Sequence, residues 1–255
     1  MAKAKVGIEV IVFQGREQKD MDGVLKECAE AGYSCVETGF IFDKYTPEQM
    51  KGLCKKYNLE YAAGHGGYDT IADEKKLKKT IKDIKDTGGS YIICSGVAQG
   101  KDMERYKESA RVFNRAGKIA RDEGLIFCYH NHAFEFEMID GAKGIHILGE
   151  ETDPEFVKFN IDVAWVQIGG ESPSKFIERY SNHAGYYHFK DAFIKDKDKI
   201  IWTELGKGDI ELEPAYKMAL SKGAKYIIYE EDVAQIDVNQ AIRESREFLR
   251  RQLDI

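Results

Sequence analysis

The amino-acid sequence predicts an α/β protein folded as one (β/α)8 barrel. Short apolar, β-branched runs alternate with amphipathic helical segments, and eight such strand-then-helix units fill the 255 residues. An open doubly wound sheet usually has fewer strands and a glycine-rich turn after the first strand, whereas no G-x-G-x-x-G follows the first apolar run here. No linker or low-complexity tract divides the chain, so a single domain over residues 1–255 is expected.

The N-terminal half contains four strand–helix units with clear boundary signals. Gly32 and Gly124 stop the first and fourth helices, and Thr46, Pro47 and Gln49 supply an N-cap, a first-turn proline and a capping box for the second. The predicted strands are Lys5–Phe13, Ser34–Thr38, Tyr61–Gly64 and Tyr91–Cys94. The predicted helices are Met21–Ala31, residues 46–57, Glu74–Asp86 and residues 103–122.

The C-terminal half continues the alternation of strands and helices, and it begins with the most informative stretch, Leu125–Glu137. Its first part is an apolar run typical of a buried parallel strand, and its second part carries two histidines, an asparagine and two glutamates. The remaining predicted strands are Phe156–Asp162, Tyr186–Lys190 and Tyr226–Tyr229. The predicted helices are Ile145–Glu150, residues 172–180, Pro214–Ser221 and Val238–Leu253, and a long loop precedes Pro214.

Composition argues against several classes of partner. A formal net charge of −6 and a pI near 5.6 give no global attraction to nucleic acid. The N-terminus lacks the apolar core of a signal peptide, and no apolar run reaches membrane-spanning length. Five cysteines without a Cys-x-x-Cys pair are typical of reduced, buried thiols. We therefore expect a cytoplasmic protein with neither nucleic acid nor membrane as a partner.

Polar residues cluster at the predicted strand ends, where active sites of this fold lie. These residues are able to bind metal, move protons or hold hydroxyl groups, and they come from six strands: Glu37, His65, Asn131, His132, Glu135, Asp162, His188, Lys190 and Glu230. This pattern is the strongest functional signal in the sequence.

Strand periodicity predicts which of these side chains share a face. His188 and Lys190 have the same parity and can point into one pocket. In the fifth strand, His132 and Glu135 have opposite parity, so both reach the site only if the chain bends near Ala133. His130 is expected to pack behind the strand.

Three carboxylates and one imidazole form a set suited to a divalent metal with open positions. Glu135, Asp162, His188 and Glu230 are the predicted ligands, and they suit Mn²⁺, Mg²⁺, Co²⁺ or Zn²⁺ without a thiolate.

Five blocks of the sequence resemble the sugar phosphate isomerase/epimerase family of xylose isomerase-like barrels. They begin at Tyr129 (YHNHAFEF), Asn160 (NIDVAW), His188 (HFKD), Gly206 (GKGDI) and Tyr229 (YEED), in matching order over essentially the whole chain. The resemblance implies one divalent ion, most readily Mn²⁺, held by the four residues named above. It also implies that the sugar pocket is lined by His132, Lys190, Trp165, His65 and Glu37, and Asn131 is a further candidate for binding substrate. The choice of Glu135 over Glu137 as the ligand from the fifth strand rests on this resemblance alone.

The expected reaction is proton abstraction next to a carbonyl group, through a metal-stabilised enediolate. Glu135 and Glu230, on opposite walls, would take a proton from one carbon and return it to the same or the adjacent carbon, and His132 or Lys190 would shuttle the hydroxyl proton. The sequence thus predicts a metal-dependent sugar isomerase or epimerase. Its substrate would be a small, unphosphorylated ketose, keto-sugar or inosose, because no convincing phosphate cradle is present.

Three alternatives remain open. A lyase or dehydratase acting on a keto-sugar, keto-glycoside or keto-inositol would use the same metal and first base. A DNA-repair endonuclease of the related barrel type would need more histidine and carboxylate ligands and a basic rim. The net charge of −6 argues against this function. A sugar-binding barrel without catalysis is the third. A homo-oligomer is expected only by analogy with similar barrels.

Overall fold

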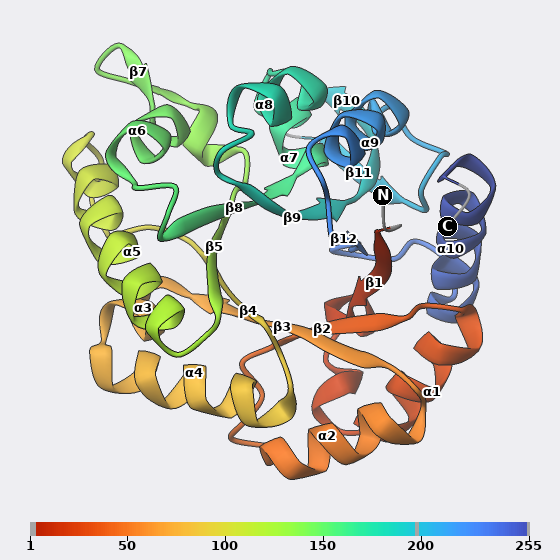
Figure 1. Ribbon diagram of the computed structural model, residues 1–255. Coiled ribbons are helices and arrows are strands. Elements are labelled where there is room, and N and C mark those ends of the chain that lie inside the picture. Colours follow the sequence, from red (N-terminus) through yellow and green to blue (C-terminus); the bar gives the residue numbers. More distant parts are fainter. Residues whose placement is uncertain (1–3, 197–198, 254–255) are drawn as a thin grey trace.

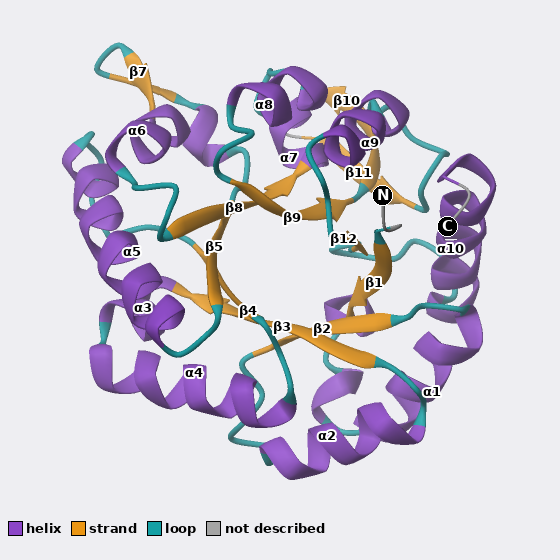
Figure 2. Ribbon diagram, in the orientation of Figure 1, coloured by secondary structure: helices purple, strands orange, loops and turns teal. Residues whose placement is uncertain are grey.

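A computed structural model describes residues 4–196 and 199–253 and shows a closed barrel of eight parallel strands with helices around it (Figure 1, Figure 2). The strand order around the barrel is β1-β12-β9-β8-β5-β4-β3-β2. The barrel strands are β1 (Lys5–Glu9), β2 (Cys35–Gly39), β3 (Glu60–Gly67), β4 (Tyr91–Ser95), β5 (Ile126–His130), β8 (Val157–Asp162), β9 (Ala184–Phe189) and β12 (Tyr226–Tyr229). The predicted (β/α)8 barrel is confirmed.

The helices form the outer layer and bury one apolar stripe against the strands. They are α1 (Met21–Ala31), α2 (Pro47–Lys56), α3 (Tyr68–Ala72), α4 (Glu74–Thr87), α5 (Glu104–Asp122), α6 (Gly144–Glu151), α7 (Val163–Ile168), α8 (Pro173–Arg179), α9 (Leu212–Ser221) and α10 (Val238–Leu253). The predicted capping box is present, because Thr46 Oγ1 accepts the Gln49 N–H and Gln49 Oε1 accepts the Thr46 N–H. Across the described residues, no helix combines the length and apolar content needed to cross a bilayer.

The two ends of the chain close the barrel. β1 pairs with both β2 and β12, so the first and last strands lie side by side. In the outer layer α10 lies against α1 (Figure 1). The Tyr33 hydroxyl, just after α1, donates to the Ile242 carbonyl at 2.9 Å, and Arg246 Nε donates to the Gly32 carbonyl at 2.8 Å. These contacts hold the ends of the sequence together.

The first strand is shorter than predicted. β1 ends at Glu9, and Val10–Phe13 forms a 3₁₀ turn in place of the expected continuation. The Glu9 carboxylate caps this turn by accepting the Ile11 N–H at 3.1 Å, and Gln14 follows with φ of 53°. Val10, Val12 and Phe13 are buried in this turn, which explains why the apolar pattern of the sequence continues past the end of the strand. The end of β1 thereby places a carboxylate at the rim of the barrel.

Two short hairpins are additions that the sequence did not reveal. β10 (Asp191–Asp196) and β11 (Lys199–Thr203) pair antiparallel where a long loop was expected. β6 (Met138–Ile139) and β7 (Ala142–Lys143) form the second hairpin, which projects from the barrel beside α6 (Figure 1). Both hairpins follow barrel strands and border the end of the barrel where those strands finish.

Apolar side chains fill the interior of the barrel, and a layer of polar side chains lies nearer the C-terminal ends of the strands. Gly7 has no space for a side chain, since a Cβ there would lie 2.5 Å from both Cys35 Sγ and Ile228 Cδ1. Side chains with the same parity fill the remaining interior, including Ala63, Tyr91, Cys128, Tyr186 and Tyr226. The barrel is therefore closed below by apolar groups, and its next inward layer is polar.

Candidate metal centre

Each of the eight barrel strands supplies an inward polar side chain within two residues of its C-terminal end or just after it. This polar layer consists of Glu9, Glu37, His65, Ser95, His130, Asp162, His188 and Glu230. The register supports the arrangement, because Glu9 lies beside Glu37, Ser95 beside His130, and Asp162 beside His188 in neighbouring strands. All of these side chains except His65 and Ser95 are fully buried or nearly so.

Four members of this layer form a tight group of metal-ligand type. One atom from each of His130, Asp162, His188 and Glu230 lies within 4.8 Å of the others. His188 Nδ1 is 2.5 Å from Glu230 Oε2, and His130 Nε2 is 3.9 Å from Asp162 Oδ2. The structure thus brings together three of the four predicted ligands and adds a second imidazole.

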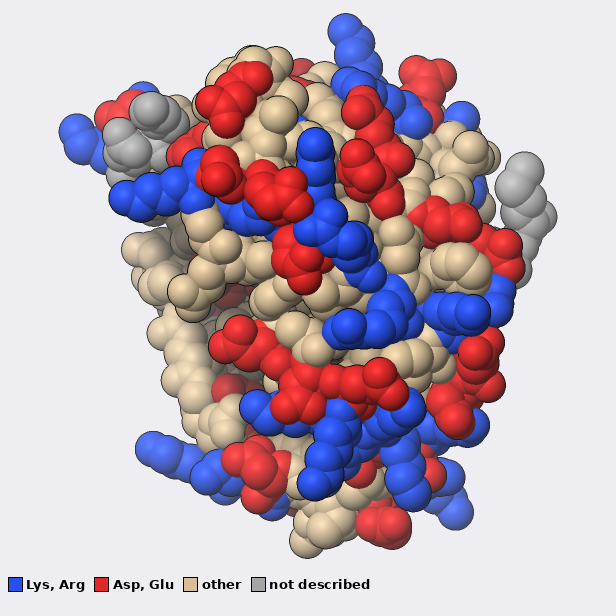
Figure 3. All heavy atoms as spheres, turned by 90° about the vertical axis from the view of Figure 1, so that its left-hand side faces the viewer, with Lys and Arg blue, Asp and Glu red and all other residues tan. Residues whose placement is uncertain are grey.

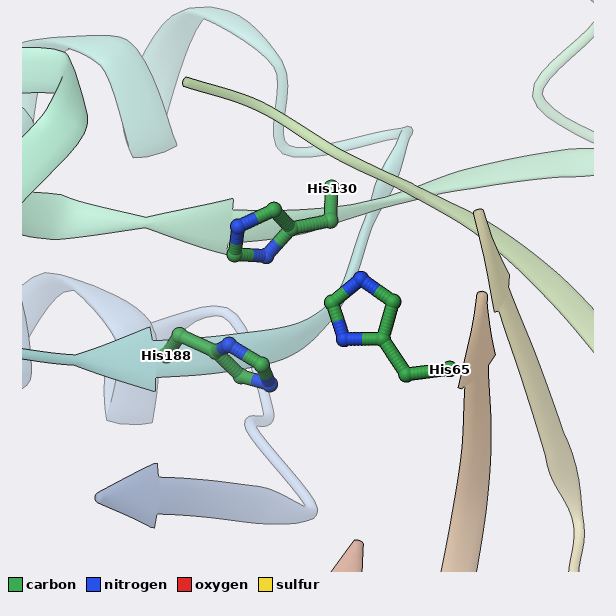
Figure 4. Close-up of side chains that lie close together, drawn as sticks. All are labelled: His65, His130 and His188. Atoms are coloured by element: carbon green, nitrogen blue, oxygen red, sulfur yellow. The ribbon is translucent and has the colours of Figure 1, made fainter. Parts of the chain in front are cut away.

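A third imidazole borders this group. His65, His130 and His188 come from three different strands and point toward one another (Figure 4). Their ring centroids are 4.9 Å apart for His65 and His130, 4.9 Å for His130 and His188, and 5.8 Å for His65 and His188. Three ring nitrogens that converge in this way could share a bound cation.

The residues present fit a divalent metal. Asp162 is fully buried, yet its Oδ2 accepts no hydrogen bond among the described residues, although Lys190 Nζ lies 3.3 Å away. Burial raises the pKa of Asp162 to about 6, which reflects the cost of its charge in this environment. Two imidazoles and two carboxylates form a donor set suited to Mn²⁺, Zn²⁺ or Co²⁺ more than to Mg²⁺, which prefers oxygen.

Glu135, the predicted ligand from the fifth strand, does not join the group. β5 ends at His130, and Glu135 lies in a 3₁₀ turn, Phe134–Phe136. Its carboxylate accepts the Tyr129 hydroxyl at 2.5 Å and the His132 N–H at 2.9 Å. Burial raises the pKa of Glu135 to about 7. Glu137, the other candidate from this segment, is exposed. The chain does bend at Ala133, but the bend ties Glu135 to its own segment.

His130 occupies the place expected for Glu135, and the expectation that it packs behind the strand is wrong. It has the parity of Cys128, which faces the barrel interior, so the last residue of β5 points inward as well. Asn160 Nδ2 lies 3.2 Å from His130 Nδ1 and leaves Nε2 facing Asp162. The alternation of side chains along the strand is therefore sufficient to predict that His130 points into the barrel.

A matched pair of substitutions separates the two candidates from the fifth strand. His130→Gln is expected to weaken divalent metal binding by about 100-fold or more, since losing even an outer partner of a ligand costs ~10–100-fold. Glu135→Gln is expected to leave metal content unchanged and to lower the free energy of unfolding by about 1–2 kcal/mol, because one buried hydrogen bond is disturbed. Calorimetric metal titration and urea unfolding measure both. The reverse order of metal affinities would restore Glu135 as the ligand.

Lys190 is the cation of the site. Its side chain is buried, and Nζ lies 2.9 Å from Glu230 Oε1, 3.3 Å from Asp162 Oδ2 and 2.8 Å from Asp232 Oδ1. Burial alone would lower the pKa of Lys190, but these three carboxylates outweigh it and raise the pKa above its usual value. Lys190 is therefore an ammonium group, able to donate hydrogen bonds and protons but not to act as a resting base. Asp232 is a partner that sequence reasoning missed.

A cavity of about 360 Å³ opens above the metal group. Its lining includes Glu230, His130, His65, His132 and Asp232. His132 Nδ1 is buried and has no hydrogen-bond partner among the described residues. Burial and the nearby Lys190 ammonium lower the pKa of His132 to about 4, so its ring is neutral at pH 7. The volume suits one small molecule the size of a monosaccharide.

The other predicted pocket residues have mixed placements. His65 lines the cavity and is held by Glu37 at 2.8 Å and Ser95 at 2.6 Å. Glu37 is fully buried and also contacts His188 Nε2 at 3.0 Å, so it orients two imidazoles below the cavity. Asn131 does not face the cavity, because its amide pairs with the backbone N–H and C=O of Asp162.

Trp165 lies near the site at the start of α7. Its backbone N–H donates to Asp162 Oδ1 at 2.9 Å, so the predicted ligand Asp162 also caps this helix. The ring centroid of Trp165 is 5.7 Å from that of His132 and 5.5 Å from Lys190 Nζ. Trp165 therefore packs beside the acid–base residues rather than lining the cavity itself.

The Gly206–Ile210 loop wraps around Asp191. Asp191 Oδ2 accepts the N–H groups of Gly206 at 2.8 Å and Gly208 at 3.0 Å, and Oδ1 accepts those of Ala192 at 2.9 Å and Ile210 at 3.2 Å. A Cβ on Gly208 would lie 2.3 Å from Asp191 Oδ1, so only glycine fits there. These N–H groups already have an anionic partner, so the loop offers no phosphate cradle.

Asp191→Asn is expected to lower the free energy of unfolding by about 3 kcal/mol. One oxygen that accepts two N–H groups becomes an amide nitrogen, and hydrogen bonds to a charged group contribute about 1.5–3 kcal/mol each. Asp209→Asn is the matched control, because Asp209 Oδ2 accepts a single N–H among the described residues, that of Ile194 in β10. Urea unfolding of both variants measures the difference, and equal losses would contradict the role given to Asp191.

The surface offers no basic stripe on the face drawn in Figure 3. Lys and Arg side chains are interspersed with Asp and Glu over this face, and a recess opens toward its left edge. This distribution does not resemble the clustered basic surface of a protein that tracks a phosphate backbone.

Comparison with known proteins agrees with this architecture. The family model described as "Xylose isomerase-like TIM barrel" matches residues 25–252. An inosose dehydratase of Mesomycoplasma hyopneumoniae is 26% identical over 260 residues, covering 87% of this chain and 86% of that protein. A sugar phosphate isomerase/epimerase structure from Parabacteroides distasonis has a TM-score of 0.83 at 21% identity, covering 98% and 94% of the two chains. The IolI protein, solved with a zinc atom, has a TM-score of 0.77 at 14% identity and 98% coverage of both chains. The chain belongs to the xylose isomerase-like TIM barrel family.

Proposed function

We propose that this protein is a metal-dependent enzyme that removes a proton next to the carbonyl group of a small keto-sugar or keto-inositol. The observation that carries the proposal is the convergence of His130, Asp162, His188 and Glu230 below a cavity lined by the neutral imidazole of His132, with the Lys190 ammonium group bound to two lining carboxylates, Glu230 and Asp232. These four residues would hold one divalent ion. When bound, the ion supplies positive charge that stabilises the enediolate formed from the substrate.

The residues around the cavity can move the protons. Lys190 and His188 outweigh the effect of burial on Glu230 and keep its pKa well below the usual value, so Glu230 is ionised. Its carboxylate lines the cavity and can accept a proton. His132 lines the cavity from the β5 side, and its neutral ring, whose Nδ1 has no partner among the described residues, can take up a substrate hydroxyl proton while Glu230 returns to carbon the proton that it removed. The Lys190 ammonium can donate to an oxygen that gains negative charge.

Two walls with proton-transfer groups favour isomerisation or epimerisation as the outcome. In the barrel order, β5 and β12 are separated by β8 and β9 on one side and by four strands on the other. His132, after β5, and Glu230, after β12, therefore approach the cavity from different directions. This pair replaces the expected pair of Glu135 and Glu230. The substrate we propose is unphosphorylated, because the Gly206–Ile210 N–H groups are taken by Asp191.

Dehydration is the second candidate, and the curated relatives favour it. The relative from Mesomycoplasma hyopneumoniae is an inosose dehydratase and covers 87% of this chain. The same proton abstraction would then be followed by loss of a β-hydroxyl group, which Lys190 can protonate as it leaves. Keto-inositols thus belong in any substrate panel.

Product identification tests the proposal and separates the two outcomes. Metal-loaded protein is incubated with unphosphorylated ketoses, 3-keto-glycosides and inososes, and the products are analysed by NMR and mass spectrometry. An isomer or epimer of unchanged mass supports the first outcome, and loss of one water supports the second. Turnover in none of these classes, with metal bound, would contradict the proposed function. Glu230→Gln is the catalytic control, and it is expected to lower the rate by about 10²–10⁴-fold.

A further inference from the structure

A second group of metal-ligand type lies beside the first. One atom from each of Glu9, Glu37 and His65 lies within 4.8 Å of the others, and this group, the Glu9 cluster, shares no residue with the four donors described above. We propose that the Glu9 cluster binds a second divalent cation. The inference does not depend on the reaction proposed for the first site.

The fold brings these side chains together through three adjacent strands. Glu9 ends β1 and lies directly beside Glu37 of β2 in the parallel ladder. His65 of β3 lies beside Gly39 and reaches back to Glu37, so that its Nδ1 is 2.8 Å from Glu37 Oε1. The other ring nitrogen is 2.6 Å from Ser95 Oγ, which fixes the ring orientation as outer partners of metal ligands do. The cluster is thus built by barrel strands rather than by loops.

Glu9 carries an oxygen that no described group satisfies. The residue is 3% exposed, and its Oε1 accepts the Ile11 N–H at 3.1 Å. Its Oε2 is buried and has no hydrogen-bond partner among the described residues. A buried carboxylate oxygen without a donor is costly, and a bound ion is one of the few ways to satisfy it. Because Glu9 also lines the cavity, an ion can reach it from solvent.

The excess of carboxylates over ammonium groups also favours a bound cation. The carboxylates at or beside the polar layer are Glu9, Glu37, Asp162, Glu230 and Asp232. Lys190 contacts three of them, Asp162, Glu230 and Asp232. Glu9 and Glu37 therefore have no ammonium partner among the described residues, and a divalent ion could supply the missing positive charge.

The donor atoms of the Glu9 cluster indicate which metal ions it would bind. Two carboxylates and one imidazole suit Mn²⁺ or Zn²⁺, and three protein donors leave open coordination positions. Glu9 and His65 line the cavity, so these positions would face a substrate. The second ion would then be placed to bind substrate hydroxyl oxygens on the wall formed by β1–β3.

Metal stoichiometry tests the inference without relying on activity. Protein freed of metal with a chelator is titrated with Mn²⁺ by calorimetry, and the bound metal is measured after desalting by mass spectrometry. Two equivalents are expected for the wild type. Glu9→Gln and His65→Asn, which lie on different strands, are each expected to bind one, and Asp162→Asn is expected to bind one as well. Glu17→Gln, which alters another cavity-lining carboxylate, is expected to bind two.

The outcomes separate this inference from the proposed function. One equivalent in the wild type that persists in Glu9→Gln and is lost in Asp162→Asn would overturn the second site and leave the first. One equivalent that is lost in Glu9→Gln and persists in Asp162→Asn would support the Glu9 cluster and contradict the first site. Circular dichroism of each variant confirms folding, and the wild-type stoichiometry decides the question even where a variant does not fold.

Discussion

Asp162→Asn is expected to release the catalytic metal and to lower kcat by about 10³-fold. Asp162 is buried and supplies one of four converging donors, and its Oδ2 has no hydrogen bond in the part of the chain that the structure describes. An ion that stabilises a developing enediolate contributes several kcal/mol, and each 1.36 kcal/mol corresponds to tenfold in rate. The fold should survive, because asparagine can still accept the Trp165 N–H as the N-cap of α7.

Metal analysis and turnover of the same preparation measure this effect. Asp86→Asn is the matched control, since Asp86 lies on α4 and pairs with exposed Lys82. The control is expected to keep wild-type metal content and rate. If Asp162→Asn retained both its metal and its rate, the assignment of the metal centre would fail.

Lys190→Met is expected to lower kcat by about 10²–10⁴-fold while metal remains bound. The methionine side chain preserves the apolar stem between Trp165 and Trp202, whose rings lie 5.5 Å and 5.3 Å from Lys190 Nζ. It removes the ammonium that can protonate or polarise a substrate oxygen, and general acid catalysis is worth about this factor. Steady-state kinetics of the metal-loaded variant measures the loss.

The same substitution has a second signature in stability. Without metal, Asp162, Glu230 and Asp232 would lose their shared cation, which typically costs about 3–5 kcal/mol for a buried pair. Metal should therefore raise the melting temperature of Lys190→Met more than that of the wild type. Lys207→Met is the control, because Lys207 pairs with Glu204 and Glu244 near the surface. Equal metal-induced shifts in all three proteins would argue against the role of Lys190 as a counter-ion.

The barrel could be predicted because its local signals are strong. Apolar runs and helix caps such as Thr46 and Gly32 identify most elements, since each depends on neighbours in the sequence. The hairpin β10–β11 was missed because its strands are partly exposed and carry charged residues, unlike the buried apolar runs of the barrel strands. The end of β1 was misplaced because the apolar pattern continues into the 3₁₀ turn.

The site was predicted in part, for a physical reason that Glu135 and His130 illustrate. Strand ends alone placed Asp162, His188 and Glu230 at one rim, since parallel strands finish at the same end of a barrel. The identity of the metal ligand from the fifth predicted strand depends on where β5 ends and on how the chain turns after it. Glu135 is held by Tyr129 and by the backbone of its own turn, a contact that no periodicity reveals. Glu9 lies in the middle of the predicted strand Lys5–Phe13, and it reaches the rim only because β1 ends at this residue.

Anomalous diffraction from a crystal grown with Mn²⁺ is the most direct test of the metal centre. The account predicts a peak coordinated by His130, Asp162, His188 and Glu230, with Glu135 still bonded to Tyr129. A Mn²⁺ peak coordinated by Glu135, or the absence of any peak among the four donors, would contradict it.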